Sequence, residues 1–472
     1  MLALPPSLVA FSLAVLAAAS PAPIAAPAPA PTPEPVPAPQ VASTIESVFS
    51  SATGAVASAL PTILGGWPSL SDIEKKIGVN DGNDLSNVSA SGLLIPSYAN
   101  YSGNWNLRFY GLAYKLPNIS TSDLDSLIDG LSTNDLNSTQ QQLLQNRTQD
   151  LASIPIPKAN LTALVFANGS SITNSSGIQL QTADDFGEFD QFVTVPGLPD
   201  NSSTSVQVVQ TGLLNVTGPG NGTVILVPST GISIVSDIDD VMRITKVYVP
   251  NQGLFNSFVQ PYVNVPGVPE LFAKWAKSLT SAAFHYDTTT PVELTRTYVD
   301  YLFSNFPLGS LEMRPINLTE PSQVLDARQN SLLKLFQTFP QRKFVLVGDT
   351  SSSTLLSAYP QIAQQFPNNI ACIFIRNTSA TDSDDKIPYD TSPFKNVKNG
   401  TYFFYRTAED LMNLDIEGGQ CVNSSIPQNV TFGEQGGILD SGSNGAASAV
   451  FGRTQYAAAV VGAVVAFALS LF

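Results

Sequence analysis

Two acidic strand ends are the main chemical signal in the sequence. The apolar run at residues 232–236 leads directly into Asp237, and Asp239 follows two positions later. A second apolar run, at residues 343–348, ends in Asp349. A carboxylate that attacks phosphorus needs its repulsion from the phosphate offset by a cation such as Mg²⁺, and a second carboxyl group can protonate the leaving group. The pattern therefore indicates metal-assisted phosphoryl transfer.

Each acidic strand end also has a simpler explanation. Asp residues at such positions often cap a helix or stabilise a turn. The alternative weakens when Asp237, Asp239 and Asp349 are taken together, because two separate segments then deliver carboxylates to one place. We therefore carry these residues forward as candidate site residues.

The elements that position these residues change character along the chain. From Gly231 onward, β-like runs alternate with helical patterns, which predicts a mainly parallel sheet with helices on both faces and a ligand site at the carboxyl ends of the strands. The expected strands are residues 232–238, 282–286, 344–347 and 370–375, and the expected helices are residues 269–279, 291–303, 324–339 and 358–366.

The half before Gly231 has a different pattern. Short apolar runs separated by Asn, Gly, Ser and Pro predict a β-rich, sandwich-like domain over residues 94–229. Leucine spacing over residues 123–150 predicts an inserted helical hairpin. We expect this half to serve packing or recognition rather than catalysis. The expected strands are residues 105–114, 161–166, 191–195, 206–209 and 222–227.

Several motifs occur in an order and spacing that resemble one known family. They are residues 236–245, 261–268, 284–291, 306–309, 339–349 and 373–376. Together they are similar to the actin-patch-type phosphatidate phosphatase catalytic domain, a branch of the haloacid dehalogenase superfamily with lipin-like chemistry. The resemblance covers roughly residues 231–414. It implies a haloacid-dehalogenase-like α/β fold, Mg²⁺ as cofactor, and phosphatidate or another phosphorylated lipid as substrate.

The resemblance also implies a role for each site residue. Asp237 would be the phospho-accepting nucleophile, and Asp239 the general acid and base. Asp349 would join Asp237 and the backbone carbonyl of Asp239 around Mg²⁺. Thr288 would hydrogen-bond the transferring phosphoryl group, and Arg328, where the family has Lys, would stabilise the phosphoaspartate.

The sequence departs from the family pattern at several of these positions. Val241 replaces a Thr whose hydroxyl supports the loop, so we expect a looser nucleophile loop. Arg328 keeps the positive charge of the Lys but not its shape. The run at residues 350–353 lacks the acidic residue that the family places after Asp349, where this chain has Ser352. His285 matches the family motif, but its aromatic neighbours favour a packed core histidine.

The two ends of the chain predict export and membrane attachment. The apolar run at residues 8–19 closes on small residues, as in a cleavable signal peptide, and an alanine-proline tract follows it. Residues 456–472 form an uncharged apolar tail behind small residues and a spacer, which predicts a glycosylphosphatidylinositol (GPI) anchor attached at Asn444. The alternative is a membrane span retained in the mature protein.

Composition supports an extracellular location and excludes some partners. The glycosylation sequon Asn-x-Ser/Thr recurs between Asn87 and Asn429, including Asn168 and Asn377, which predicts a secreted glycoprotein. A net charge of −15 with a single histidine argues against a nucleic-acid partner. The two cysteines, Cys372 and Cys421, would form a disulfide in an oxidising compartment; the alternative is two buried thiols.

These observations predict one domain organisation and leave three hypotheses of function. The leading hypothesis is a Mg²⁺-dependent phosphatidate phosphatase-like hydrolase at the fungal cell surface. Its rival is a catalytically weakened or inactive glycosylated surface protein with the same fold, and a hydrolase for a soluble phosphoester stays open. The predicted segments are a signal peptide (1–20), a leader and linker (21–93), a β-rich domain (94–229), a catalytic domain (230–415), a Gly/Ser-rich stalk (416–455) and the tail (456–472).

Overall fold

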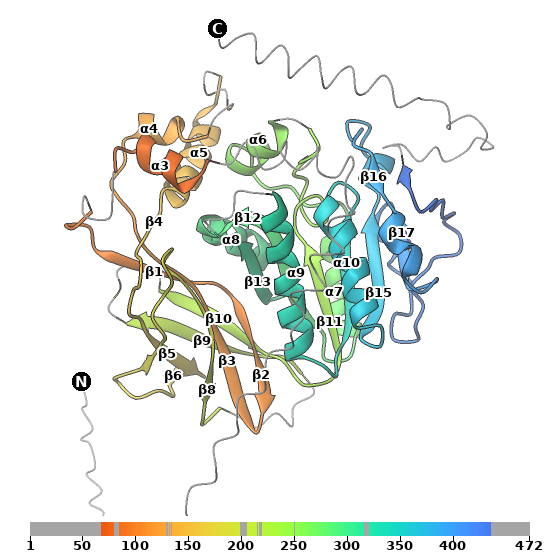
Figure 1. Ribbon diagram of the computed structural model, residues 1–472, viewed down its shortest axis with the longest axis horizontal. Coiled ribbons are helices and arrows are strands. Elements are labelled where there is room, and N and C mark those ends of the chain that lie inside the picture. The colour runs from red at the N-terminus through yellow and green to blue at the C-terminus, as the bar shows by residue number, and fades with distance from the viewer. Residues whose placement is uncertain are drawn as a thin grey trace, which may run out of the picture. The chain divides into compact units, whose positions relative to one another are not determined.

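Two β-sheets dominate the fold, one mostly antiparallel and one parallel (Figure 1). The computed structural model describes residues 68–435 apart from residues 80–84, 129–130, 132, 134, 199–204, 215, 217–219, 250 and 316–320. All described residues belong to one compact unit. The predicted signal peptide, the alanine-proline tract and the anchor tail with Asn444 lie outside the described residues.

The parallel sheet forms the second half of the described chain. Its six strands follow the order β13-β12-β11-β14-β15-β17, and every neighbouring pair is parallel. The central strand β11 is buried along its whole length, as expected for a strand covered on both faces. Its strands are β11 (Ile232–Asp237), β12 (Ala283–Pro291), β13 (Gly309–Arg314), β14 (Lys343–Asp349), β15 (Ile370–Arg376) and β17 (Tyr402–Tyr405).

Helices cover both faces of this sheet, as the alternating sequence pattern predicts. Side chains of α7 (Val268–Ser278) and α8 (Thr295–Asn305) share one hydrophobic cluster with Ile234 of β11. Side chains of α9 (Pro321–Thr338) and α10 (Ser353–Gln365) share another with Val235, the next residue of the same strand. Because neighbouring strand residues face opposite sides, the two helix pairs lie on opposite faces.

The β-rich half forms a single 10-stranded sheet. Its long strand β3 pairs with β1 and β2 on one side and with β8 on the other, and β10 pairs with β2 and β9. Strands near opposite ends of the sheet contribute to one hydrophobic cluster, which contains Leu94 of β1 and Val165 of β5. The strands are β1 (Ala90–Leu94), β2 (Ser97–Ser102), β3 (Asn104–Lys115), β4 (Ile154–Pro155), β5 (Thr162–Ala167), β6 (Ser170–Ser171), β7 (Ile178–Gln179), β8 (Glu188–Val195), β9 (Gln207–Leu214) and β10 (Asn221–Leu226).

Short helices complete the β-rich half. The helical insertion is present as α4 (Thr121–Asp125) and α5 (Ser138–Leu151), and α3 (Leu70–Lys76) precedes the sheet. The α5 helix begins at a capping box in which Asn137 and Gln140 exchange side-chain-to-backbone hydrogen bonds, so its start is fixed by local sequence. The mixed α/β class with a β-rich region ahead of a parallel sheet, predicted from the sequence, is confirmed.

The remaining elements lie around the parallel sheet. The predicted disulfide is present: Cys372 of β15 is bonded to Cys421, with the two Cα atoms 5.4 Å apart. No helix within the described ranges is long and apolar enough to cross a membrane. The other elements are α6 (Gln252–Phe258), η1 (Val292–Leu294), η2 (Thr378–Ala380), β16 (Tyr389–Asp390), η3 (Ser392–Asn396), η4 (Ala408–Asp410) and β18 (Glu434–Gln435).

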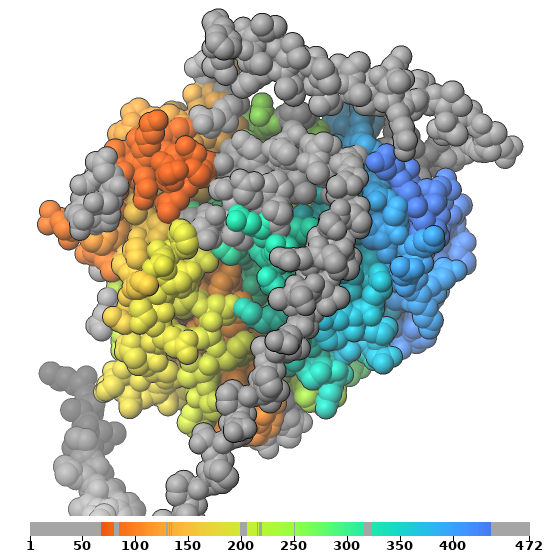
Figure 2. Space-filling model, viewed as in Figure 1, coloured from red at the N-terminus to blue at the C-terminus, as the bar shows by residue number. Residues whose placement is uncertain are grey.

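Arg342 connects the end of the β-rich half to the start of the parallel sheet. This side chain is fully buried and lies just before β14. Its guanidinium donates hydrogen bonds to the backbone carbonyls of Pro228 (2.8 Å), Thr230, Ile232 (2.6 Å) and Ser281 (2.6 Å). One buried cation therefore fixes the path of the chain between the two sheets. Figure 2 shows the orange and yellow surface of the β-rich half beside the teal surface of the parallel-sheet half.

Candidate active site

A row of carboxylates crosses three neighbouring strands at their carboxyl ends. In the parallel register, Asp237 of β11 pairs with Asp287 of β12, and Asp287 pairs with Glu312 of β13. Asp237 and Asp287 are only 4% and 5% exposed. Parallel strands place such residues at one edge of the sheet, where ligands bind in this class of fold. The site therefore concentrates negative charge at the position that the sequence predicts.

Arg328 of α9 lies between the first two members of this row. Its Nη2 atom is 3.2 Å from Asp237 Oδ1, and its Nε atom is 3.6 Å from Asp287 Oδ2. The second contact is an ion pair but is too long for a hydrogen bond. Burial alone would lower the pKa of Arg328, but the two carboxylates raise it, so the side chain stays cationic. Arg328 thus neutralises part of the charge on both strands.

Asp237 carries the most crowded carboxyl group of the site. Burial raises its pKa well above the usual range, and although the charge of Arg328 opposes this, the charges of Asp349, Asp239 and Asp287 raise it further. Like charges brought together out of water shift pKa values in this direction. Asp349 and Asp239, the other two carboxylates predicted from the sequence, thus both act on the charge of Asp237.

Asp349 ends β14, the strand on the other side of β11. Its Oδ1 atom accepts hydrogen bonds from the backbone N–H of Ser351 (2.6 Å) and of Ser352 (3.1 Å) and from the Ser351 hydroxyl. Its Oδ2 atom is buried and has no hydrogen-bond partner among the described residues. Burial, followed by the charge of Asp240, raises the pKa of Asp349 to about 7. The serine-rich run that replaces the family's acidic sequence thus orients Asp349 and adds no charge.

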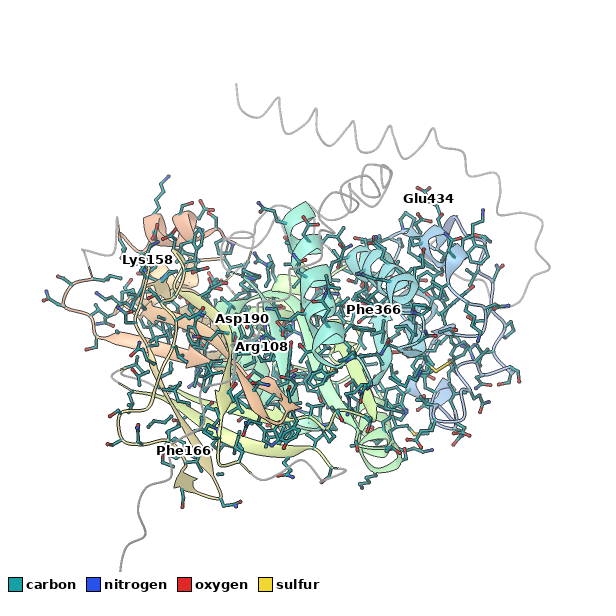
Figure 3. All side chains as sticks on the ribbon, turned by 60° about the horizontal axis from the view of Figure 1, so that its bottom comes forward. Arg108, Lys158, Phe166, Asp190, Phe366 and Glu434 are labelled. Atoms are coloured by element: carbon teal, nitrogen blue, oxygen red, sulfur yellow. A yellow bond between two sulfur atoms is a disulfide. The ribbon has the colours of Figure 1, made fainter. Side chains whose placement is uncertain are left out.

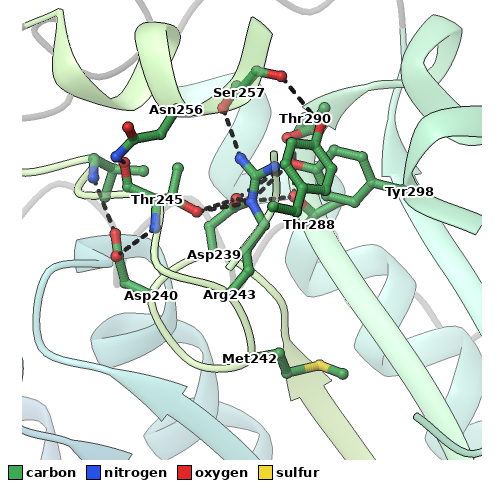
Figure 4. A network of polar contacts seen from close by, with 12 residues as sticks. Asp239, Asp240, Met242, Arg243, Thr245, Asn256, Ser257, Thr288, Thr290 and Tyr298 are labelled. Carbon is green, nitrogen blue, oxygen red and sulfur yellow. Dashed lines mark hydrogen bonds and ion pairs between the residues drawn. The ribbon is translucent and has the colours of Figure 1, made fainter. Parts of the chain in front are cut away.

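Asp239 belongs to a separate polar network (Figure 4). Its Oδ1 atom lies 2.9 Å from Nε of Arg243 and accepts a hydrogen bond from Thr245 at 2.8 Å. Its Oδ2 atom accepts the hydroxyl of Thr288 at 2.7 Å, and the Tyr298 hydroxyl donates to Oδ1 at 3.1 Å. Burial alone would raise the pKa of Asp239, but the charge of Arg243 and these hydrogen bonds lower it. Asp239 is therefore ionised at neutral pH in the free protein.

The loop that carries these residues is held by Asp240. This residue has a positive φ of 56°, and its carboxylate accepts hydrogen bonds from the backbone N–H groups of Thr245 (2.9 Å), Lys246 (2.7 Å) and Val247 (2.9 Å). Val241 is fully buried in the hydrophobic cluster below the loop. The backbone contacts of Asp240 thus support the loop at the point where the sequence lacks the family's Thr hydroxyl.

The helical insertion of the β-rich half reaches this network through a stacked aromatic ring. Tyr262 lies between two guanidinium groups, with Arg243 at 4.0 Å and Arg147 of α5 at 4.2 Å from its ring centroid. Arg147 also donates hydrogen bonds to the carbonyls of Ser257 (2.9 Å) and Gln260 (2.7 Å). The arginine that pairs with Asp239 is therefore positioned partly by a helix of the β-rich half.

His285 is a core residue, as its apolar surroundings in the sequence favour. It is 2% exposed, and its ring nitrogens lie 2.8 Å from the Ser310 hydroxyl and 3.3 Å from the Ser233 hydroxyl. Burial, assisted by the charges of Arg342 and Arg108, lowers its pKa to about 3, so the ring is neutral. Its hydrogen bonds satisfy a buried neutral imidazole.

Sequence reasoning missed several members of the site. Asp287 was noticed only as part of a motif, although it follows an apolar run in the same way as Asp237 does. Glu312 was missed because β13 was not expected as a strand. Arg243 lies next to the Asp-rich element, but nothing in the sequence showed that its guanidinium would return to Asp239.

The residues present can be compared with what a divalent cation requires. Among the described residues, no group of three or more His, Cys, Asp or Glu side chains is arranged to hold a metal ion. Mg²⁺, however, often takes only one or two protein carboxylates together with waters. Asp237 and Asp349 fit this smaller set, because Asp349 Oδ2 is buried without a hydrogen-bond partner in the described chain and the two charges disfavour each other.

A family model matches the segment of the chain that carries this site. Residues 232–377 match the model of the family described as "Phosphatidate phosphatase APP1, catalytic domain". All five site residues predicted from the sequence lie within that range: Asp237, Asp239, Thr288, Arg328 and Asp349. The match also contains Asp287 and Glu312, whose positions only the structure revealed.

Individual relatives are similar over part of their length. The chain is 26% identical over 281 residues to Phosphatidate phosphatase APP1 of Saccharomyces cerevisiae, which covers 57% of this chain and 46% of that protein. It is 30% identical over 156 residues to an uncharacterized protein of Schizosaccharomyces pombe, covering 31% and 25% of the two chains. The chain thus spans less than half the length of these relatives.

Solved structures add little to this comparison. A sialyltransferase from Photobacterium damsela is 14% identical, covering 47% of this chain and 38% of its own, with a TM-score of 0.16. This likeness is too low to carry an argument about fold or function.

Proposed function

We propose that this protein is a Mg²⁺-dependent phosphatidate phosphatase-like hydrolase that releases phosphate from a phosphorylated lipid through an aspartyl-phosphate on Asp237. The observation that supports the proposal is that Asp237 and Asp349 end two neighbouring parallel strands, β11 and β14, with Asp239 two positions beyond Asp237. The similarity to phosphatidate phosphatases over residues 232–377 supports it. The parallel strand order and the site at its carboxyl edge favour a haloacid-dehalogenase-like fold.

Asp237 is the proposed nucleophile. Its carboxylate oxygen would attack phosphorus, forming a bond to phosphorus as the bond to the leaving alkoxide breaks. Arg328 already holds Asp237 by an ion pair and would offset negative charge on the phosphoaspartate. A Mg²⁺ ion held by Asp237 and Asp349, with the Asp239 carbonyl that the family resemblance implies, would supply the positive charge that lets a phosphate dianion approach these carboxylates.

Asp239 is the proposed acid and base. In the first step it would give a proton to the leaving alkoxide, and in the second it would take a proton from the water that hydrolyses the phosphoaspartate. The hydroxyl of Thr288 now donates to Asp239, and a bound phosphoryl oxygen would take that hydrogen bond over. Losing it raises the pKa of Asp239, which favours the protonated acid that the first step needs.

The location of the protein is a further part of the proposal. The signal-peptide pattern, the sequons and the apolar tail support an exported glycoprotein held at the cell surface by a GPI anchor at Asn444. Such an anchor would keep the site beside a membrane that contains phosphorylated lipids. Treatment of intact cells with a phosphatidylinositol-specific phospholipase should release the protein if the anchor is present.

The test is phosphate release by the purified mature protein from short-chain phosphatidate with and without Mg²⁺. The expected result is release that needs Mg²⁺ and is lost in Asp237→Asn. The matched control is Asp185→Asn, because Asp185 forms an exposed pair with Lys158 far from the site in sequence. Unchanged release in Asp237→Asn would exclude the mechanism.

Two observations favour the second candidate, a glycosylated surface protein that keeps this fold with weakened or no turnover. Arg328 occupies the space between Asp237 and Asp287, and the segment after Asp349 contributes serines instead of a further carboxylate. Calorimetric titration with Mg²⁺ and vanadate separates the two candidates. An intact site binds the two together, whereas a decayed site shows no coupled binding.

A further inference from the structure

The helical insertion of the β-rich half contains a buried cation that no carboxylate of the described chain balances. This cation is Arg147 of α5, which is only 6% exposed. Burial lowers its pKa from the ordinary value, and the positive charge of Arg243 lowers it further. A buried cation without an anionic partner is costly to the folded state. Stability alone therefore gives no reason for an arginine at this position.

The contacts of Arg147 lead to the arginine that pairs with Asp239. Its guanidinium donates hydrogen bonds to the backbone carbonyls of Ser257 (2.9 Å) and Gln260 (2.7 Å), at the end of α6 and just beyond it. The hydroxyl of the same Ser257 accepts a hydrogen bond from Nη2 of Arg243 at 2.6 Å (Figure 4). Arg147 thus fixes the residue that receives one end of the Arg243 guanidinium.

The ring of Tyr262 is a second route between the two arginines. Its face is contacted by Arg147 at 4.2 Å and by Arg243 at 4.0 Å, and its hydroxyl donates to the Ser257 carbonyl at 3.2 Å. A guanidinium is attracted to an aromatic face, more strongly where water is excluded. Loss of Arg147 would therefore remove one of the groups that fix the plane of this ring.

Arg243 in turn holds the carboxylate of Asp239. This arginine is 1% exposed, and its Nε atom lies 2.9 Å from Asp239 Oδ1 and 2.8 Å from the Thr245 hydroxyl. A reacting group must be held closely, because misplacement by about 1 Å can cost on the order of a hundredfold in rate. A shift of the Arg243 guanidinium would be passed directly to Asp239.

Other contacts join the two halves of the chain without α5. Arg108 of β3 contacts the two carboxylate oxygens of Asp190 at 2.6 and 2.7 Å, and its guanidinium also pairs with Glu312 of β13. Figure 3 shows Arg108 and Asp190 close together in the interior of the molecule. The Tyr110 hydroxyl donates to the Met313 carbonyl at 3.2 Å. A substitution in α5 therefore leaves the halves joined, and its effect on the site can be measured by itself.

From these contacts we propose that Arg147 is a positioning residue for Asp239, so that the helical insertion, which lies outside the matched domain, takes part in catalysis. This inference rests on the proposed function, because it takes Asp239 as the acid and base. Arg147 would act through Ser257, Tyr262 and Arg243 and would not touch the substrate. We therefore expect its loss to lower kcat and to leave KM nearly unchanged.

The first measurement is the rate of phosphate release from dihexanoyl phosphatidate in MgCl₂ buffer by the purified mature protein. Arg147→Met should lower kcat about tenfold or more with KM within about twofold. Arg147→Lys keeps a cation near the ring but not the two-pronged contact, so it should lower kcat only about threefold. The matched control is Asp150→Ala, which removes the pair that α5 forms with Arg296 of α8 and should change kcat by less than about twofold.

Two further measurements do not depend on turnover. In protein labelled with ¹⁵N-arginine, NMR gives the rate at which the Arg243 Nε–H exchanges with water, and Arg243→Lys assigns its signal. Exchange should be about tenfold faster in Arg147→Met and unchanged in Asp150→Ala, because only the first variant loosens the guanidinium. The thermal midpoint of Arg147→Met should stay within about 3 °C of the wild type, since a costly buried cation is lost together with its hydrogen bonds.

Each outcome decides the proposal. Wild-type kcat in Arg147→Met overturns it, and so does an equal loss in Asp150→Ala, which would show a general loosening of α5. If Arg147→Met does not fold, Arg147→Lys decides: wild-type kcat and wild-type exchange together overturn the proposal. Failure of the proposed function has a different signature, because the wild-type protein would then release no phosphate while the exchange of the Arg243 Nε–H still depended on Arg147.

Discussion

The guanidinium of Arg328 joins the ends of two adjacent strands, with Nη2 3.2 Å from Asp237 Oδ1 and Nε 3.6 Å from Asp287 Oδ2. All three side chains are buried, so Arg328 offsets part of the charge of the two carboxylates with little help from water. Removing one member of such a group leaves an uncompensated charge, which is the costly case for buried ion pairs. The first prediction follows from this arrangement.

Arg328→Met should destabilise the protein by about 3–5 kcal/mol and abolish phosphate release, because two buried carboxylates would then face each other. Urea unfolding measures the first effect. Arg328→Met combined with Asp287→Asn should recover part of the stability. Arg406→Met serves as a control, because its pair with Asp410 is formed by a half-exposed side chain and such pairs contribute little. Equal losses in the two single variants would contradict this account.

Val241→Thr restores the residue type that the related family has, yet it should destabilise this protein. Val241 is fully buried among apolar side chains, and Asp240 already supports the loop. A hydroxyl buried without a partner costs about 1–3 kcal/mol. Val263→Thr, at a side chain that is 56% exposed, should cost much less. Thermal unfolding of both variants checks the prediction, and a Val241→Thr protein as stable as the wild type would show that the loop offers the hydroxyl a partner.

Glu293 should make stability depend on pH. Burial raises its pKa from 4.5 to about 7, with the charge of Arg314 only partly opposing the effect. The folded state therefore holds this proton more tightly than the unfolded state, so folding stability falls as pH rises through the window from about 4.5 to about 7. Glu293→Gln should remove this loss, making the variant more stable than the wild type at pH 8, by on the order of 1–3 kcal/mol.

Urea unfolding at pH 4 and pH 8 tests this sign. At pH 4 the two proteins should differ little, because Glu293 is then protonated in both states. Glu409→Gln, at an exposed position, should leave the pH dependence unchanged. A wild type whose stability rises relative to Glu293→Gln between the two pH values would exclude the assignment.

The disulfide should stabilise the parallel-sheet half. It joins Cys372 to Cys421 across 49 positions, and in the chain-entropy model a loop of that size corresponds to about 4 kcal/mol. Replacing both cysteines by Ala should therefore lower the midpoint of thermal unfolding measured by calorimetry. A reducing agent should lower the wild-type midpoint to that of the variant. A change of less than about 2 °C would mean that the reduced chain compensates for the missing cross-link.

Glycan occupancy should differ between two sequons. Asn377 is 1% exposed, and its Oδ1 atom accepts the Ser379 hydroxyl at 2.8 Å, so a glycan on its side chain does not fit the folded protein. Asn168 lies in an exposed turn with a positive φ of 49° and has room for one. Mass spectrometry of peptides from secreted protein should find a glycan at Asn168 and an unmodified Asn377. A glycosylated Asn377 would mean that modification precedes folding of β15.

Much of the fold follows from the sequence because its signals are local. The buried run ending at Asp237 and the amphipathic pattern of α9 are visible without any partner element. The β13 strand was missed because Gly309–Arg314 is short and carries Glu312 and Arg314, two charges that strand patterns do not favour. Those charges are accommodated by partners far away in the chain, such as Arg108, which no local pattern reveals.

In the candidate site, too, some residues can be found from the sequence and others cannot. Asp237 and Asp349 are found from the sequence because each directly follows an apolar run, and Asp239 is found because it lies two residues after Asp237. The partner of each carboxylate is not found, since Arg328 is 91 positions from Asp237 and Thr288 is 49 positions from Asp239. Which cation balances which anion is decided by strand register and helix placement, and these emerge only when the whole sheet has assembled.

The buried guanidinium of Arg342 bonds four carbonyls where the chain passes from the β-rich half to the parallel sheet. Several of these bonds would have to break before the backbone could bend at this crossing. We therefore expect the two sheets to move as one body, so that conformational change near the carboxylate row comes from side chains and loops.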